Sequence, residues 1–237
     1  GLKLQERSVF ELSPASTGEF FHAAMDYLIK MVRKQKLDLA ALDSQQLNEM
    51  VDEIVDQILN DPENLQFAIL KSSNRMSYIS SQLVETIRRM AATLHEQSKR
   101  TPMRATQTEV MFGRIGAEQG MKSLSFELPN NRKVEVRGKI DRIDQMAIDG
   151  KNYVGIVDYK SSDHDFNLSD AYQGTTMQMM TYLDAVKRNL DTITGDKDAQ
   201  IAGALYLHLS NPKLAFKEIL KLASDDDFLE ALLSKEK

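Results

Sequence analysis

The segment YVGIVDYK, residues 153–160, is an apolar run that ends in an acid, an aromatic residue and a base. Val and Ile at this run length predict a strand buried in a sheet. Because successive strand side chains point to opposite faces, Asp158 and Lys160 share one face. A buried acid and a buried base are costly unless they are paired or used in a reaction. The segment therefore predicts either a structural salt bridge or a functional site.

The preceding segment GKIDRID, residues 138–144, carries a second acid, Asp141. The tight turn IDGKN, residues 148–152, would join the two segments as a hairpin and bring Asp141 close to Asp158. Two neighbouring carboxylates raise each other's pKa unless a cation lies between them, and their oxygens suit Mg²⁺ or Mn²⁺. Lys160 would then orient or deprotonate a water, or neutralise a phosphate. The alternative, a salt bridge between Asp158 and Lys160 at a sheet edge, stays open.

Three further signals are weaker. The spacing of Asp158 and Lys160 recurs at Asp149-Gly150-Lys151, which we predict to be a hairpin turn. Gln178 and Tyr182 lie four residues apart in an expected helix and share a face. His22, in GEFFHAAMD, lies on the first expected helix, where a packed histidine is more common than a metal ligand.

The first hundred residues are predicted to be helical. The first helix lies in SPASTGEFFHAAMDYLIKMVRKQ, where Ser16 and Glu19 have the spacing of a capping box. A second helix, about 43–59, opens on Asp43 with Gln46 three residues later, and a third helical region covers about 63–100, ending before Pro102. The segment 37–70 contains eight acidic residues and no Lys or Arg, whereas the segment 71–104 contains seven basic residues and two acidic ones. This asymmetry indicates either an anionic partner for the basic block or a solvated helix face.

Strands follow the helices. EVMFG and LSFEL read as short strands, PNNR as a hairpin turn, and KVEVRGKIDRID and NYVGIVDYK as longer strands. A helix, AYQGTTMQMMTYLDAVKRN, a strand, IAGALYLHL, and a charged helical tail complete the chain. The fold class is therefore α/β (α+β). We expect one domain, with a helical N-terminal part over 1–104 and a sheet-containing part with a helical tail over 105–237.

The composition excludes several classes. The 237-residue chain has a net charge of −5, which argues against a strongly basic nucleic-acid module, and no run long enough for a membrane span. It has no cysteine, which excludes disulfides and cysteine nucleophiles here and fits a reducing cytoplasm. The first residue is Gly, not Met, so we expect a fragment of a longer protein.

The segments GEFFH, GKIDRID, DYK and QMMTY, in this order, resemble the RecB-like branch of the PD-(D/E)XK nucleases. The similarity extends more narrowly to the C-terminal nuclease domain of the AddB/RexB subunits of bacterial ATP-dependent helicase–nucleases. It covers about residues 2–210 and is strongest over 134–184. The resemblance implies a restriction-endonuclease-like core, with a central mixed sheet flanked by helices.

The resemblance also implies roles for single residues. His22, Asp141, Asp158 and the backbone carbonyl of Tyr159 would bind the metal. Asp141, Asp158, Lys160 and Gln178 would be the catalytic residues, and Tyr182 would support the substrate. Two acids have lesser roles: Glu109 could be a supporting acid, and Asp144 is read as structural or as a support to the ligands.

The implied function is a metal-dependent DNA exonuclease domain, using Mg²⁺ or Mn²⁺, that hydrolyses single-stranded DNA in double-strand break repair and homologous recombination. The implied partners are DNA and an AddA/RexA-type helicase–nuclease subunit, in the cytoplasm and without a membrane. AddB proteins often hold an iron–sulfur cluster through four cysteines, but this cysteine-free chain is expected to hold none. The alternative is a non-catalytic DNA-binding or partner-docking module of the same fold.

Overall fold

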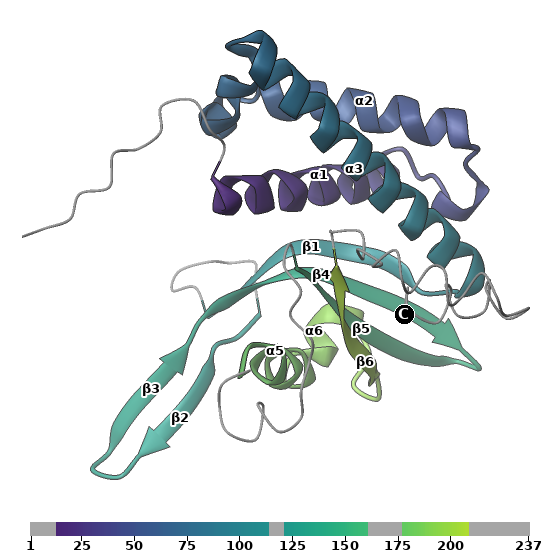
Figure 1. Cartoon of the computed structure of the whole chain (residues 1–237). Helices are drawn as coiled ribbons and strands as arrows, with labels where there is room; N and C mark the ends of the chain where they lie inside the picture. The colour runs from purple at the N-terminus through teal and green to yellow at the C-terminus, as the bar shows by residue number, and fades with distance from the viewer. Residues whose placement is uncertain (1–12, 114–120, 161–176, 209–237) are drawn as a thin grey trace, which may run out of the picture.

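A computed structural model of the chain describes residues 13–113, 121–160 and 177–208. The helical N-terminal part forms one layer above a sheet (Figure 1). Its elements are α1 (Pro14–Lys34), the 3-10 helix η1 (Leu39–Ala41), α2 (Ser44–Asn60), the 3-10 helix η2 (Pro62–Lys71) and α3 (Asn74–Arg100). The prediction that the first hundred residues are helical is confirmed over the described residues.

The start of α1 differs from the predicted capping box. The N-cap is Ser13, whose side chain accepts a hydrogen bond from the N–H of Ser16, and Pro14 occupies the first turn. Proline suits this position because its φ is already helical and it has no N–H to leave unsatisfied. Ser16 is therefore a donor to the cap, and the predicted box between Ser16 and Glu19 is wrong.

The second and third helical predictions have different outcomes. Asp43 and Gln46 form the predicted capping box at the start of α2. The predicted region 63–100 is two elements, because η2 ends at Lys71 and Ser73 caps a new helix by accepting from the N–H of Met76. Serine competes for backbone hydrogen bonds, which favours a helix start over a helix interior.

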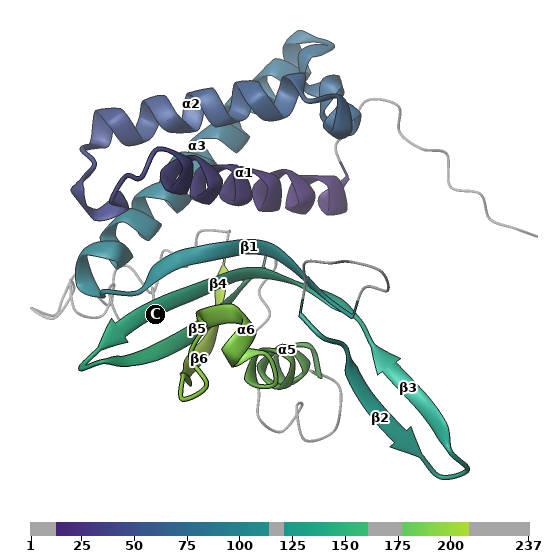
Figure 2. The same ribbon diagram turned by 180° about the vertical axis from the view of Figure 1, so that it is seen from behind.

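The main sheet is mixed, as predicted. Its strand order is β1-β4-β5-β6, with antiparallel pairs β1–β4 and β4–β5 and a parallel pair β5–β6. The strands are β1 (Arg104–Phe112), β4 (Gly138–Ile148), β5 (Lys151–Lys160) and β6 (Gln200–His208). A separate hairpin of β2 (Leu124–Leu128) and β3 (Arg132–Val136) projects away from the body of the protein (Figures 1 and 2).

The two predicted turns are confirmed by their backbone conformations. Asp149 and Gly150, between β4 and β5, have φ values of 50° and 75°. Asn130 and Asn131, between β2 and β3, have φ values of 77° and 55°. Gly, Asn and Asp tolerate this left-handed region better than other residues, which is why they form tight hairpin turns. Asp149 is thus a turn residue, and its Asp-x-Lys spacing has no part in the site.

The sheet is buried on both faces by helices. Val157 and Tyr159 of β5 pack in the same core as α1, α2 and α3, whereas Val154 and Ile156 pack on the opposite face with α5 (Met177–Lys187) and α6 (Leu190–Thr194). This alternation explains why the strand is apolar throughout. Figures 1 and 2 show the helical layer on one side of the sheet and α5 and α6 on the other. The part of the predicted helix that precedes residue 177 and the predicted tail after residue 208 lie outside the described residues.

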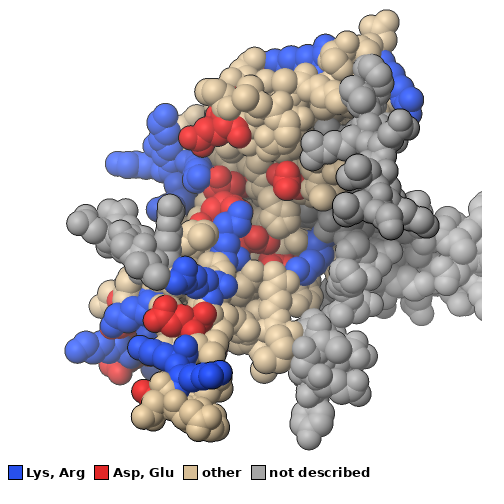
Figure 3. Space-filling model, turned by 90° about the vertical axis from the view of Figure 1, so that its left-hand side faces the viewer, with Lys and Arg blue, Asp and Glu red and all other residues tan. Residues whose placement is uncertain are grey.

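Some of the basic residues of 71–104 form ion pairs with acidic residues of 37–70. Nη2 of Arg88 on α3 lies 2.7 Å from Oδ1 of Asp52 on α2, and Nε of Arg104, the first residue of β1, lies 3.2 Å from Oδ1 of Asp38. Figure 3 shows both signs of charge on one face, with Lys and Arg most numerous in its lower part. Within the described ranges, no helix combines the length and hydropathy required to cross a bilayer.

Candidate functional site

The site lies where β4 and β5 separate. Their ladder extends from the turn to the pair Arg142–Val157 and ends there. Beyond it, β4 pairs only with β1, whereas β5 stays paired with β6 as far as Lys160. The two strands therefore diverge at Asp141 and Asp158, and both acids lie at the opening between them. A hairpin that closes at one end and opens at the other leaves backbone groups free to bind side chains or ligands.

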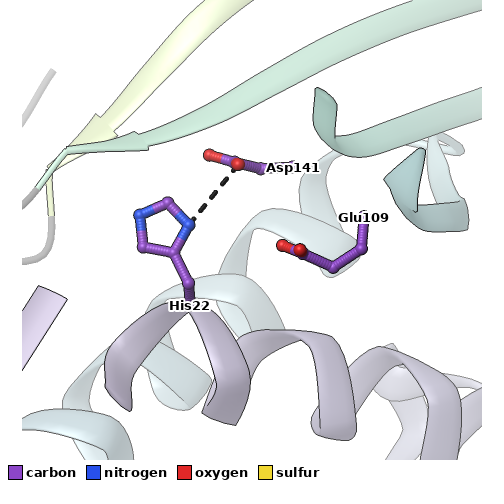
Figure 4. A group of neighbouring side chains, drawn as sticks. All are labelled: His22, Glu109 and Asp141. Carbon is purple, nitrogen blue, oxygen red and sulfur yellow. Dashed lines mark ion pairs between the residues drawn. The ribbon is translucent and has the colours of Figure 1, made fainter. Parts of the chain in front are cut away.

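Asp141 bridges the opening. Its Oδ2 accepts a hydrogen bond of 2.8 Å from the backbone N–H of Tyr159, in place of a ladder bond. Its Oδ1 lies 3.4 Å from Nδ1 of His22, on the helix α1 that faces the sheet (Figure 4). Asp141 is 7% exposed, so water screens these contacts weakly. The structure thus brings together His22 and Asp141, which are far apart in the sequence.

The ionisation of His22 reflects this contact. Burial alone lowers the pKa of His22, but the hydrogen bond to Asp141 and the charges of Asp141, Glu109 and Asp158 outweigh burial, so the pKa is raised. The neighbouring acids thus favour the protonated form of His22. A cation bound among the acids would compete with the proton of His22.

Glu109 is the third member of the group. It lies on β1 between Thr108 and Val110, which pair with Arg142 and Ile140, so the register sets Glu109 opposite Asp141. One oxygen or nitrogen from each of His22, Glu109 and Asp141 lies within 4.8 Å of the others (Figure 4). Glu109 has a φ of 53°, an uncommon conformation for a non-glycine residue, and strain of this kind concentrates at functional sites.

Asp158 lies beside this group and has different partners. Its Oδ2 is 2.5 Å from Nζ of Lys160, and its Oδ1 accepts a hydrogen bond of 3.2 Å from Nε2 of Gln178. Burial, followed by the charge of Asp141, raises the pKa of Asp158, although Lys160 opposes the shift. The salt bridge of the structural alternative is therefore present, but it lies at the strand opening and not at a free sheet edge.

Gln178 connects the acid, the base and the next helix. Its Oε1 accepts a hydrogen bond of 2.7 Å from Nζ of Lys160, and its Nε2 donates to Oη of Tyr182 at 2.8 Å. The side chain thereby holds Lys160 at the mouth of the opening, where it is partly exposed. The predicted common face of Gln178 and Tyr182 on α5 is confirmed by this contact.

A buried ion pair supports Tyr159 from behind. Arg142 donates two hydrogen bonds to Asp144, at 2.8 and 2.9 Å, and a third to Oη of Tyr159 at 3.1 Å. The Tyr159 ring packs edge-on against the ring of His22, with centroids 5.7 Å apart. Asp144 thus reaches Tyr159 through Arg142, and its supporting role stays a prediction. Arg142 was not predicted from the sequence, although its two-residue spacing from Asp144 on a strand was the available signal.

The donor set fits a divalent cation. His22, Glu109 and Asp141 offer one imidazole nitrogen and two carboxylates, and carboxylates suit Mg²⁺ or Mn²⁺. The N–H of Tyr159 points into the opening, and in a strand the N–H and C=O of one residue point toward the same neighbour. The predicted carbonyl ligand therefore faces this space. Asp158 lies outside the group of three, because Lys160 and Gln178 engage its carboxylate.

Comparisons with known proteins agree with this geometry. A model of the PD-(D/E)XK nuclease superfamily matches residues 1–236. Curated relatives named as subunits of an ATP-dependent helicase/deoxyribonuclease include those of Levilactobacillus brevis (57% identical, 100% of this chain, 20% of the relative), Lactiplantibacillus plantarum (48%, 100% and 19%) and Enterococcus faecalis (43%, 99% and 19%). The chain spans about a fifth of the length of these relatives. The match over nearly all of its residues shows that this chain belongs to the PD-(D/E)XK nuclease superfamily.

Proposed function

We propose that this chain is the metal-dependent deoxyribonuclease domain of a helicase–nuclease subunit, and that it hydrolyses single-stranded DNA from an end. The observation that carries the proposal is the strand opening, where His22, Asp141 and Asp158 meet Lys160 and Gln178. The names of the relatives support DNA as the substrate, because each is called a helicase/deoxyribonuclease subunit.

The metal would be Mg²⁺ or Mn²⁺, held by His22, Asp141, Asp158 and the carbonyl of Tyr159, with Glu109 as a further acid. When bound, such an ion would polarise the phosphate and lower the pKa of an attacking water. Asp158 would have to exchange its contact with Lys160 for the metal. Its raised pKa favours that exchange, because a buried carboxylate next to Asp141 gains from an added positive charge.

Lys160 would act on the substrate once Asp158 releases it. Gln178 accepts from Nζ of Lys160 and would keep the ammonium at the mouth of the opening. There, Lys160 would neutralise a phosphate oxygen or orient a water, while Tyr182 would fix the position of Gln178. Hydrolysis would break the P–O bond to the 3′-oxygen and leave a 5′-phosphate and a 3′-hydroxyl, with water supplying the hydroxyl group on phosphorus and the proton on the leaving oxygen.

The wider setting is part of the proposal. The domain would act in the cytoplasm with an AddA/RexA-type subunit, in double-strand break repair and recombination. We also propose that residues 1–104 and 105–237 form one domain, because the His22 helix contributes to the site on the sheet and shares a core with Val157 and Tyr159.

One observation favours the non-catalytic alternative: Asp158 and Lys160 form the ion pair that a purely structural role would require. Both proposals predict DNA binding, but only a nuclease loses activity when Asp158 is made neutral. The test is cleavage of an end-labelled single-stranded oligonucleotide with Mg²⁺ and with EDTA, using Asp158→Asn. Asp149→Asn is the matched control, because it makes the same change in the other Asp-x-Lys motif, at the turn. DNA binding by the wild-type chain without Mg²⁺-dependent cleavage would support the non-catalytic module, and cleavage by the Asp158→Asn variant at the wild-type rate would remove Asp158 from the proposed site.

A further inference from the structure

The β2–β3 hairpin carries an apolar strip that continues outward from the core. Leu124 is fully buried, whereas Phe126, Leu128 and Val134 on the same face are 42%, 45% and 41% exposed. Phe126 lies directly opposite Val134, so the exposed side chains form one continuous surface. Figures 1 and 2 show that the hairpin extends beyond both the sheet and the helical layer.

Basic side chains surround this strip. Residues 122–139 contain five basic and two acidic residues, although the chain as a whole carries a net charge of −5. Arg132 and Lys133 are exposed and make no ion pair among the described residues, whereas Arg137 pairs with Glu135 and Lys139 with Glu109. Arg132 lies opposite Leu128 and shares the face of Phe126, whereas Lys133 lies opposite Glu127 on the other face. In Figure 3 the lower part of the molecule, which includes the hairpin, displays the largest group of Lys and Arg side chains. This surface is therefore locally cationic on an acidic protein.

One basic side chain lies over the exposed ring. The guanidinium carbon of Arg188, on the segment that follows α5, is 5.6 Å from the ring centroid of Phe126. A cation over an aromatic ring keeps the ring in one orientation while its outer edge stays accessible. Aromatic rings beside Arg or Lys are the usual elements of surfaces that bind single-stranded nucleic acid, because bases stack on the ring and phosphates contact the cations.

The hairpin is continuous with the site. β3 ends at Val136 and β4 begins at Gly138, so one nearly unbroken length of chain joins Arg132 to Asp141. At about 3.3 Å per residue, this distance is roughly 30 Å. A DNA strand bound along the hairpin would therefore extend to the opening where β4 and β5 separate.

We propose that the β2–β3 hairpin is a binding arm for the single-stranded DNA that the site cleaves, with bases on Phe126 and a phosphate on Arg132, which shares its face. The inference rests on the proposed nuclease function and adds a substrate surface outside the metal group. A protein partner is the competing occupant of an apolar strip. The local excess of positive charge and the direct connection to Asp141 favour DNA.

The test compares two hairpin variants, Phe126→Ala and Arg132→Glu, with a control that reverses one charge on α3, Arg89→Glu. Binding of a 40-nucleotide single strand is measured with Ca²⁺ across a salt series, and cleavage with Mg²⁺ is measured on the same strand and on a chromogenic mononucleotide phosphodiester. The Arg132→Glu variant should reduce the slope of log Kd against log salt by about 0.7, the value for one phosphate contact. The Phe126→Ala variant should weaken binding roughly 5- to 100-fold with the slope unchanged.

Each outcome decides the proposal. Both hairpin variants should cleave the small phosphodiester at the wild-type rate, because they leave the metal group intact. If the hairpin variants bind the 40-nucleotide strand with the same affinity as the control variant, the binding-arm proposal is wrong. A change in oligomeric state or in affinity for a partner protein, with DNA affinity intact, would assign the strip to a protein and would also overturn it. If the wild-type chain cleaves neither substrate, the nuclease proposal itself fails.

Discussion

The backbone N–H of Tyr159 donates a hydrogen bond of 2.8 Å to Oδ2 of Asp141 at the point where β4 and β5 stop pairing. A side chain on β4 thus replaces the backbone acceptor that a continuous ladder would supply. The side chain therefore satisfies the buried N–H of Tyr159 where the strands diverge. A buried N–H without an acceptor would cost about 1–3 kcal/mol. The same contact fixes the carboxylate of Asp141 beside His22 and Glu109.

Changing Asp158 to Ala should separate activity from stability. The variant should lose cleavage by at least about 100-fold, because the proposed metal loses a ligand. Its melting temperature without metal should stay equal or rise, since burial and Asp141 make the charged form of Asp158 unfavourable. Parallel circular dichroism melts and DNase assays measure both. A variant that unfolds far below the wild type would assign Asp158 to a structural salt bridge with Lys160.

Replacing His22 by Ala should weaken Mn²⁺ binding by about tenfold or more, because the group loses its nitrogen ligand. His95 on α3 is the control, since it is a buried histidine that lies outside the site, whereas His22 is half-buried. His95→Ala should lower the free energy of unfolding by about 1–3 kcal/mol and leave the metal titration unchanged. Calorimetric titration and urea unfolding on both variants test this. A His22→Ala variant that behaves as His95→Ala does would identify His22 as a packed core residue.

The metal-free protein should become less stable as pH rises above about 6.5. The pKa of His22 is raised in the folded state, so His22 contributes stability below its unfolded pKa and loses it as pH rises through the folded pKa. The raised pKa of Asp158 has the same sign, and its contribution is lost as pH rises through the folded pKa of Asp158. Metal affinity should change oppositely and rise with pH, since a metal binds the neutral imidazole of His22. Melting temperatures from pH 5 to 8, with and without Mn²⁺, should therefore diverge. A constant separation between the two curves would contradict proton-linked binding.

The positive φ of Glu109 leads to a separate prediction. Glu109→Gly should keep or raise the free energy of unfolding, by up to about 1 kcal/mol, because glycine adopts a φ of 53° without strain and the lost ion pair with Lys139 is a partly exposed one of small energy. The same variant should reduce the increase in melting temperature caused by Mn²⁺, since one carboxylate is lost. Asp149→Gly, at a φ of 50° in the β4–β5 turn, is the control for backbone relief alone. A smaller metal effect in both variants would show that Glu109 is no ligand.

The Arg142–Asp144 pair should show strong coupling. Arg142→Met alone should destabilise the protein by about 3–5 kcal/mol, because it leaves the carboxylate of Asp144 buried without a partner. Adding Asp144→Leu should recover most of that loss, since an apolar pair of similar volume carries no buried charge. Urea denaturation of the two single variants and the double variant forms the cycle. Additive losses would show that the two side chains act independently.

The sequence alone determined the local features of this protein. Apolar runs rich in Val and Ile predicted the strands, Asp149-Gly150 and Asn130-Asn131 predicted the turns, and Asp43 with Gln46 predicted a helix start. These features depend on neighbours within a few residues, so the pattern of residue types is sufficient. The roles of His22 and Tyr159 came only from resemblance to a family, because nothing in their local sequence indicates a metal.

Only the tertiary structure decided which distant groups meet. The position of Glu109 opposite Asp141, the hydrogen bond from Arg142 to Tyr159 and the bridge made by Gln178 all depend on strand register and helix packing. A shift of one residue in register would turn every side chain of a strand to the other face, so no local pattern can fix these contacts. The choice of Ser13 over Ser16 as the cap of α1 was likewise settled by the course of the chain around Pro14, since both serines are suitable in isolation.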